Sequence, residues 1–197
     1  LLIRLCQQCG TPFTFRAAGS SLSGQCSSED VLIVCNDGFK KMEVIDDGKA
    51  LKCECGVIGS DANDLLKPYN RKIGPDPATL ATALVGGILN NNSSGMCCGT
   101  AQNSYKTIRS IRVVLLDGSI LDTSDQKSID QFLKEKPQMV EDILQLRKDI
   151  LADEELTHLI HHKYKIKNTT GYGLNSLVDF EDIIDIINHL FIGSEGT

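Results

Sequence analysis

The sequence predicts an α+β protein with two lobes: a small parallel α/β lobe, and a larger lobe with a mainly antiparallel sheet and flanking helices. Two observations predict this class. A helical stripe over residues 1–8, a short strand at 13–15 and an apolar strand at 31–34 follow one another, an order typical of parallel pairing. Further along, Asp-Gly turns at 47–48 and 117–118 each separate two apolar runs, which predicts two antiparallel hairpins.

The small lobe is expected to cover residues 1–57 and the larger lobe residues 58–197. The first helix is indicated by apolar positions spaced i, i+3, i+4 and i+7, namely Leu2, Leu5, Cys6 and Cys9. The continuous apolar run at residues 31–34 is typical of a strand covered on both faces.

The larger lobe alternates hairpin and helix signals. Ser60 is in position to cap a helix that Pro68 ends. Residues 124–162 carry successive apolar stripes at helical spacing, which predicts a helical insertion. A last amphipathic helix over residues 183–190 leads into a short predicted strand at 191–192.

Composition narrows the class of partner. The 197 residues are 41% hydrophobic and carry a net charge of −6, enough chain for one large domain or two small lobes. The acidic balance and the lack of a long basic stripe argue against a nucleic-acid partner. No apolar run approaches the roughly 20 residues of a membrane-spanning helix, so no transmembrane segment is expected.

The eight cysteines favour core positions over a metal site. Cys6 and Cys9 continue a helical stripe, while Cys53 and Cys55 alternate with charged residues along a strand. The adjacent pair at 97–98 does not supply a zinc or iron–sulfur spacing by itself. Three histidines fall within one turn of a polar helix, which favours a solvated face: His158, His161 and His162. We therefore expect no bound metal, and unpaired core cysteines indicate the cytoplasm.

Four loops rich in small residues carry the strongest functional signal, at 16–25, 74–82, 90–100 and 193–197. One such loop alone is more often an ordinary turn. Four of them beside predicted strand and helix ends, each costly in conformational entropy, favour a long nucleotide lying across the junction of two lobes. The first loop follows neither the Walker nor the Rossmann glycine pattern, but its backbone N–H groups suit a phosphate or pyrophosphate.

The order of these loops resembles a known family. Residues 14–25, TFRAAGSSLSGQ, are similar to the pyrophosphate loop of the FAD-binding domain of vanillyl-alcohol oxidase and p-cresol methylhydroxylase relatives. Residues 73–78, the Gly86-Gly87 pair and residues 91–105 resemble its second region, and HLFIGSEGT at 189–197 resembles its closing motif. The resemblance covers nearly the whole chain and implies a two-lobed FAD-binding domain.

Within that family the chain is most similar to the D-2-hydroxy-acid dehydrogenase branch, which includes D-lactate, glycolate and D-2-hydroxyglutarate dehydrogenases. The runs MCCGTAQNSYKT at 96–107 and KIKNTTGY at 165–172 resemble long members with a C-terminal iron–sulfur region. An iron–sulfur cluster is therefore implied only outside this chain.

The resemblance implies non-covalent FAD and a role for each loop. Residues 18–22 bind the pyrophosphate through backbone N–H groups, and residues 76–82 lie along the flavin and ribityl chain, the last of them a candidate hydroxyl donor. Residues 92–95 lie near the lobe junction, residues 193–197 close over the other side, and Cys98 with its two successors lies near the ring. The candidate cofactor-binding residues are Ala18, Gly19, Ser20, Ser21, Leu22, Asp76, Pro77, Thr82, Gly86, Gly87, Asn92, Ser93, Ser94, Gly95, Gly99, Thr100, Gly193, Ser194, Glu195, Gly196 and Thr197.

The chain departs from the family pattern before its closing motif. Many relatives read Gly-Tyr-Asp-Leu where residues 171–174 read Gly-Tyr-Gly-Leu, so a carboxylate contact at Gly173 is absent. We assign no binding role to Tyr172 or Lys165. Arg16 either holds the first loop with its guanidinium or faces solvent.

The implied activity is that of an FAD-dependent oxidoreductase that converts a small D-2-hydroxy acid to a 2-oxo acid. The implied electron acceptor is a quinone or a cytochrome, and the location is the cytoplasm or the inner face of a membrane as a peripheral protein. The catalytic residues and any metal are expected in a following substrate domain. Two alternatives stay open: a nucleotide-binding scaffold without redox chemistry, and a cysteine-based metal or redox module.

The two ends of the chain indicate a piece of a longer protein. The sequence opens inside a helical pattern without an initiator Met, and it closes directly after a small-residue loop. We therefore expect an N-terminally truncated chain that lacks the substrate domain and binds FAD without oxidising a 2-hydroxy acid.

Overall fold

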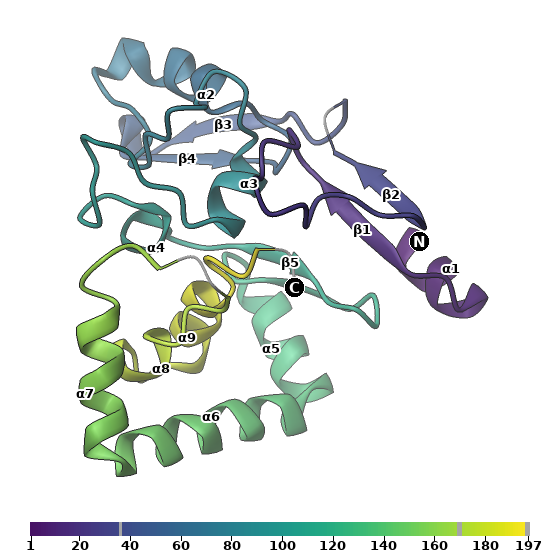
Figure 1. Cartoon of the computed structure of the whole chain (residues 1–197), viewed down its shortest axis with the longest axis vertical. Coiled ribbons are helices and arrows are strands. Elements are labelled where there is room, and N and C mark those ends of the chain that lie inside the picture. The colour runs from purple at the N-terminus through teal and green to yellow at the C-terminus, as the bar shows by residue number, and fades with distance from the viewer. Residues whose placement is uncertain (36, 169–170, 196–197) are drawn as a thin grey trace.

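The computed structural model describes residues 1–35, 37–168 and 171–195, and Figure 1 shows their arrangement. The strands are β1 (Phe13–Arg16), β2 (Val31–Val34), β3 (Met42–Ile45), β4 (Ala50–Cys53), β5 (Arg112–Val114) and β6 (Ile120–Asp122). The helices are α1 (Leu2–Cys9), α2 (Gly59–Leu66), α3 (Val85–Asn90), α4 (Ser104–Thr107), α5 (Gln126–Glu135), α6 (Pro137–Ala152), α7 (Glu154–Lys163), α8 (Ser176–Asp179) and α9 (Ile183–Leu190). Short 3₁₀ turns at Asp46–Gly48 and Lys67–Tyr69 complete the chain order.

The predicted parallel pair forms at the N-terminal end of the chain. Strand β1 pairs with β2 in parallel, with Phe13 opposite Val31. The prediction that β2 is covered on both faces is wrong: Val34 is 50% exposed. The strand belongs to a two-stranded sheet, so its apolar run has no layer packed on each side.

Both predicted hairpins are confirmed. Strands β3 and β4 are antiparallel with Met42 opposite Cys53, and β5 and β6 are antiparallel with Arg112 opposite Asp122. The first hairpin turns through Gly48 at φ +83°, and a side chain there would meet the Tyr69 ring within 2.6 Å. Two antiparallel pairs and one parallel pair, with flanking helices, confirm the predicted α+β class. The lobe boundary at residues 57 and 58 stays a prediction.

The predicted helical insertion forms helices α5, α6 and α7, which frame α8 and α9 (Figure 1). The insertion shares its core with α8, α9 and strand β6. Ile150 and Ile160 pack against Leu177 and Ile186 in one buried cluster. A second cluster joins strand β6, α5 and α9 through Leu121, Phe132 and Ile187.

Two local predictions are wrong, and one is half right. Ile58, in extended conformation, precedes helix α2, and Ser60 lies inside the helix instead of capping it. The predicted strand at 191–192 is a turn that follows α9. Of the two cysteines in the first helical stripe, Cys6 is buried and Cys9 is exposed.

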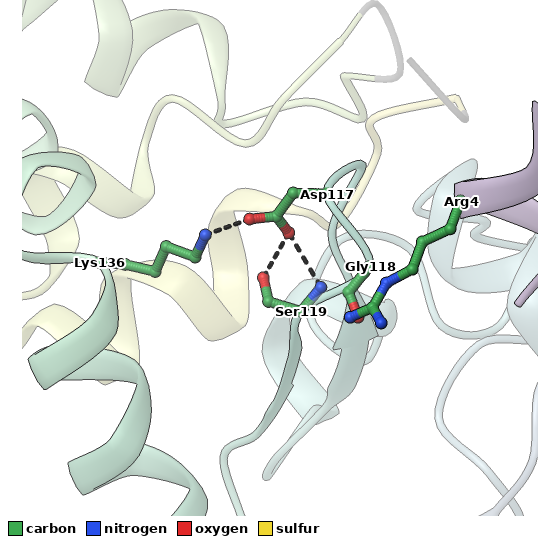
Figure 2. Close-up of polar contacts among 5 residues, drawn as sticks. All are labelled: Arg4, Asp117, Gly118, Ser119 and Lys136. Carbon is green, nitrogen blue, oxygen red and sulfur yellow. Dashed lines mark hydrogen bonds and ion pairs between the residues drawn. The ribbon is translucent and has the colours of Figure 1, made fainter. Parts of the chain in front are cut away.

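The tip of the β5–β6 hairpin is held from both sides, as Figure 2 shows. The carboxylate of Asp117 forms an ion pair with Lys136, which lies between α5 and α6, and accepts hydrogen bonds from the Ser119 N–H at 2.9 Å and hydroxyl at 2.6 Å. Arg4 of α1 donates to the Gly118 carbonyl at 3.4 Å. The hairpin therefore connects the first helix to the helical insertion.

Across residues 1–35, 37–168 and 171–195, no helix combines the length and the apolar content needed to cross a membrane.

The core clusters predict the cost of a cavity. Leu177 is 0% exposed, so Leu177→Ala should lower the free energy of unfolding by about 2–5 kcal/mol, measured by urea denaturation. The matched control is Leu146→Ala on α6, where the side chain is 48% exposed and the loss should stay below about 1 kcal/mol. Equal losses in both variants would contradict this core.

The hairpin tip predicts a pH-dependent contribution to stability. Hydrogen bonds from Lys136 and Ser119 hold the pKa of Asp117 well below its ordinary value. A carboxyl with a lowered pKa in the folded state stabilises the fold above its unfolded pKa of roughly 4, and this contribution is lost as the pH falls below that value. Lys136→Gln should therefore be slightly less stable than the wild-type chain at neutral pH, and the difference should disappear in acid. Urea denaturation over a pH series measures this difference.

The control variant is Lys134→Gln. Lys134 has no salt bridge in the described part of the chain, so this variant should show no such difference. A difference that does not depend on pH would refute the role of this ion pair.

Candidate functional site

The four small-residue loops are named here by position: loop A (16–25), loop B (74–82), loop C (90–100) and loop D (193–195). Loop A leaves strand β1, and Gly19 and Gly24 take left-handed conformations at φ +73° and +80°. The backbone N–H groups of residues 18–23 donate no hydrogen bond to any part of the chain that the structure describes. The side chains of Ser20, Ser21 and Leu22 are exposed. Loop A therefore presents a run of free donors to solvent, an arrangement suited to an anion.

Arg16 resolves the alternative left open by the sequence. A Cβ atom at Gly19 would lie 2.7 Å from the Arg16 Cζ, so the guanidinium lies directly against this glycine. Arg16 therefore packs against loop A, and its positive charge lies beside Gly19. Both features favour a phosphate ligand.

Loop B serves as a support for loop C. The Asp76 carboxylate accepts hydrogen bonds from the backbone N–H groups of Cys97 and Cys98, each at 3.1 Å. Hydrogen bonds from Cys98, and then from Cys97, hold the pKa of Asp76 below its ordinary value. A side chain at Gly95 would overlap the Asp76 carbonyl oxygen, so the two loops touch through backbone. The Thr82 hydroxyl donates to the Thr79 carbonyl at 3.2 Å.

Loop C is ordered by its own asparagines. Asn92 takes a left-handed conformation at φ +44°, and its Oδ1 accepts from the Tyr105 N–H at 3.1 Å. The Ser93 hydroxyl donates to Asn91 Oδ1 at 3.0 Å. Asn92 and Ser93 are buried, Ser94 and Thr100 are half-buried, and Gly99 is exposed. The Cys98 thiol is buried and donates to the Gly99 carbonyl at 3.3 Å.

Loop D docks onto the end of helix α3. The Gly193 N–H donates to the Leu89 carbonyl at 3.0 Å, and the Glu195 N–H donates to the Asn90 carbonyl at 2.8 Å. Ser194 is buried beside them. The last two predicted members of this loop, Gly196 and Thr197, lie outside the described residues.

The Glu195 carboxylate joins three loops. One oxygen accepts from Gln25 Nε2 of loop A at 2.8 Å, and the other accepts from Asn91 Nδ2 of loop C. Sequence reasoning assigned no role to Gln25 or Asn91, although both lie inside predicted loops. These two contacts join residues that are 170 and 104 positions apart in the sequence, so no local sequence pattern predicts them.

Helix α3 completes the cluster with its two glycines. A Cβ atom at Gly87 would lie 3.3 Å from the Ala17 Cβ, so the helix meets loop A. A Cβ atom at Gly86 would lie 2.8 Å from the Cys55 Cβ, and the Gly86 N–H donates to the Cys55 carbonyl at 2.9 Å. These contacts join the four loops and helix α3, which is labelled in Figure 1, into one cluster.

Gly173, where many relatives of the resembled family carry an aspartate, is explained by steric hindrance. A side chain at Gly173 would place its Cβ 2.7 Å from the His189 carbonyl oxygen and 3.2 Å from that of Ile192. The N–H of Gly173 donates to the Leu190 carbonyl at 2.8 Å. An aspartate therefore does not fit here, because the backbone at the end of α9 and in the turn after it occupies its place.

The alternative of a metal site is tested by the positions of the cysteines and histidines. Over the described residues, no three His, Cys, Asp or Glu side chains are grouped to hold a metal ion. Burial, and then the neighbouring Cys55, raises the pKa of the Cys53 thiol to about 11, so this thiol stays protonated at neutral pH. Since the thiolate is the metal-binding form, burial makes Cys53 a poorer metal ligand than an exposed cysteine. His158, His161 and His162 are exposed on α7, as expected for a solvated face.

Comparison with known proteins decides the family. The model of the family described as FAD binding domain matches residues 1–124. The chain belongs to this FAD-binding family. The chain is 26% identical over 189 residues to the D-2-hydroxyglutarate dehydrogenase of Pantoea ananatis, covering 94% of this chain and 18% of that protein. It is 25% identical over 122 residues to the glycolate oxidase subunit GlcD of Escherichia coli, covering 61% of this chain and 24% of that protein. The chain thus spans about a fifth of the length of the first of these relatives.

Solved structures agree on the fold of this FAD-binding domain. An alkyldihydroxyacetonephosphate synthase matches with a TM-score of 0.52 at 19% identity, covering 61% of this chain and 24% of that one. The 6-hydroxy-D-nicotine oxidase of Arthrobacter nicotinovorans matches with a TM-score of 0.52 at 13% identity, covering 61% of this chain and 26% of that one.

The residues of the cluster fit FAD. Free N–H groups and the Arg16 guanidinium in loop A suit the pyrophosphate. The Glu195 carboxylate accepts hydrogen bonds from two amide groups, which partly compensate its negative charge beside loop A.

The contact between loops B and C predicts that a single methyl group disturbs the cofactor site. Gly95→Ala should force the two loops apart at a cost of about 1–3 kcal/mol and weaken FAD binding by about tenfold or more. Quenching of flavin fluorescence in a titration measures the affinity. Gly38→Ala is the control, because a Cβ atom there meets open space. Unchanged FAD affinity in Gly95→Ala would show that this contact does not shape the site.

Proposed function

We propose that this chain is the FAD-binding part of a flavin-dependent dehydrogenase that oxidises a small D-2-hydroxy acid to a 2-oxo acid. The observation that carries the proposal is loop A, whose free N–H groups and adjacent Arg16 form an anion site inside an FAD-binding domain. The names of two relatives, D-2-hydroxyglutarate dehydrogenase and glycolate oxidase subunit, support the substrate class.

Each loop has a distinct task in this proposal. Residues 18–22 hold the pyrophosphate through backbone N–H groups. Gly87 keeps α3 close to loop A, and Gly86 keeps it close to the chain after β4. Loop B acts through Asp76, which orders loop C, and Pro77 and Thr82 lie along the ribityl side. Loops C and D then enclose the ring from two sides. The proposed ring and junction contacts are Asn92, Ser93, Ser94, Gly95, Gly99, Thr100, Gly193, Ser194 and Glu195.

The chain's own residues bind, orient and shield the cofactor. When bound, FAD supplies the hydride acceptor for oxidation of the carbon that bears the hydroxyl group. The buried parts of loops C and D exclude water from one side of the cluster. We place the catalytic base and the substrate carboxylate clamp in a substrate domain outside this chain, since the relatives are several times longer.

The proposal extends to the surroundings of the enzyme. A quinone or a cytochrome takes up the electrons, and the enzyme works in the cytoplasm or as a peripheral protein at the inner face of a membrane. The free cysteines support a reducing compartment, because none of the eight is in a disulfide.

The test is reduction of the bound flavin by substrate. The intact protein that carries this chain should purify with FAD, and D-2-hydroxyglutarate or D-lactate should bleach its flavin absorbance without air, with one 2-oxo acid formed per flavin. The matching L-enantiomer serves as the control and should leave the absorbance unchanged.

Two outcomes would overturn this function. A protein that binds FAD but is bleached by no D-2-hydroxy acid would be a nucleotide-binding scaffold of this fold. A protein that holds no FAD would contradict the cofactor assignment itself.

A further inference from the structure

A short basic segment, residues 161–167, has the opposite charge to the chain as a whole. It contains three lysines, two histidines and no acidic residue, whereas the whole chain has 26 acidic residues against 20 Lys and Arg. All five basic side chains are exposed: His161, His162, Lys163, Lys165 and Lys167. The segment runs from the last turn of α7 into the chain that follows it, on the outer edge of the molecule and away from strands β1 and β2 (Figure 1).

The helix accounts for only part of this positive charge. His161, His162 and Lys163 lie in the last turn of α7, where the helix dipole favours basic residues. Lys165 and Lys167 lie beyond the end of the helix, so the dipole does not explain them. In the described part of the chain, none of the five side chains forms a salt bridge. Their charge is therefore available to a partner.

The acidic side chain nearest in this arrangement is Asp179, which lines one hollow together with His161 and Lys165. Its Oδ2 accepts hydrogen bonds from the Tyr105 hydroxyl at 2.8 Å and from Asn175 Nδ2 at 3.0 Å. This carboxylate is thus held by contacts within the fold, and the three lysines leave the segment with an excess of positive charge.

An apolar side chain is exposed in the middle of the segment. Ile166 lies between Lys165 and Lys167 and is 71% exposed. The Tyr164 hydroxyl fixes the segment to the chain before α8, because it donates to the Tyr172 carbonyl at 3.2 Å and accepts from the Leu174 N–H at 3.1 Å. A basic surface that also exposes an apolar side chain suits a layer of anionic lipid headgroups, since lysines attract the phosphates and the apolar group enters the acyl boundary.

The basic segment also lies next to the cofactor cluster. Lys167 Nζ donates to Asn91 Oδ1 of loop C at 3.2 Å. A membrane that contacts this segment is therefore close to the proposed FAD site, as electron transfer to a lipid-soluble quinone requires.

We propose that the basic segment docks the intact protein onto an anionic membrane surface, beside the cofactor site. The inference rests on the proposed function, in which a quinone takes up the electrons. Lys163 and Lys165 attract the anionic headgroups, and Ile166 enters the headgroup layer between the lysines.

The test is co-sedimentation of the intact, FAD-loaded protein with lipid vesicles at low salt. Vesicles of phosphatidylcholine and phosphatidylglycerol, in a ratio of roughly two to one, should bind the protein, and vesicles of phosphatidylcholine alone should not. Added sodium chloride should release the protein, because salt screens exposed charges. The double variant Lys163→Gln, Lys165→Gln should bind about tenfold or more weakly. Lys167 is left unchanged, since it contacts loop C.

The matched control is the double variant Lys127→Gln, Lys134→Gln. It removes the same charge from two exposed lysines of α5 and should bind vesicles like the wild-type protein. The proposal is wrong if the mixed vesicles do not bind the protein, or if the two double variants bind them equally well. It is also wrong if soluble polyglutamate binds as tightly as the vesicles, which would indicate an acidic protein partner.

A second variant tests the apolar contact without a change of charge. Ile166→Ser should weaken binding to the mixed vesicles several-fold, whereas Leu146→Ser, at an exposed leucine of α6, should not. Equal binding of these two variants would contradict insertion of Ile166. Flavin absorbance and its bleaching by a D-2-hydroxy acid are read separately, so a failure of vesicle binding is distinct from a failure of the proposed function.

Discussion

The carboxylate of Glu195 is the contact on which the geometry of the cofactor site depends. It accepts from Gln25 in loop A and from Asn91 in loop C, while the backbone of Glu195 is bound to the end of α3. One side chain thus fixes the first and last segments of the site relative to each other. Because both oxygens are hydrogen-bonded, an acidic residue is tolerated beside a loop built for a pyrophosphate.

At three other places, a glycine allows two segments of the chain to approach each other closely. Loop C approaches loop B at Gly95, helix α3 approaches the chain after β4 at Gly86, and the turn after α9 approaches Gly173. In each place a methyl group would collide with a neighbour, so glycine is required by packing. The small-residue composition therefore serves the assembly of the loops as well as their approach to a ligand.

The parts of this architecture that were predictable from sequence are those with local signals. The turn residues at Gly48 and Gly118 predicted both hairpins, and helical spacing predicted the insertion. The coverage of Val31–Val34 was predicted wrongly, because the number of layers around a strand is a tertiary property. The role of Asp76 was not predictable for a similar reason, since its partners lie 21 and 22 residues away and have no sequence pattern in common with it.

The backbone hydrogen-bond donors divide the site into two parts. Loops B, C and D form an ordered frame, whereas the donors of loop A are free. In loop C, the N–H groups of Cys97 and Cys98 donate to Asp76 of loop B. In loop D, the N–H groups of Gly193 and Glu195 donate to carbonyls at the end of α3. Loop A keeps its N–H groups of residues 18–23 free, with Arg16 beside them. An anion that binds loop A therefore enters a frame that is already ordered, so little further entropy is lost on binding.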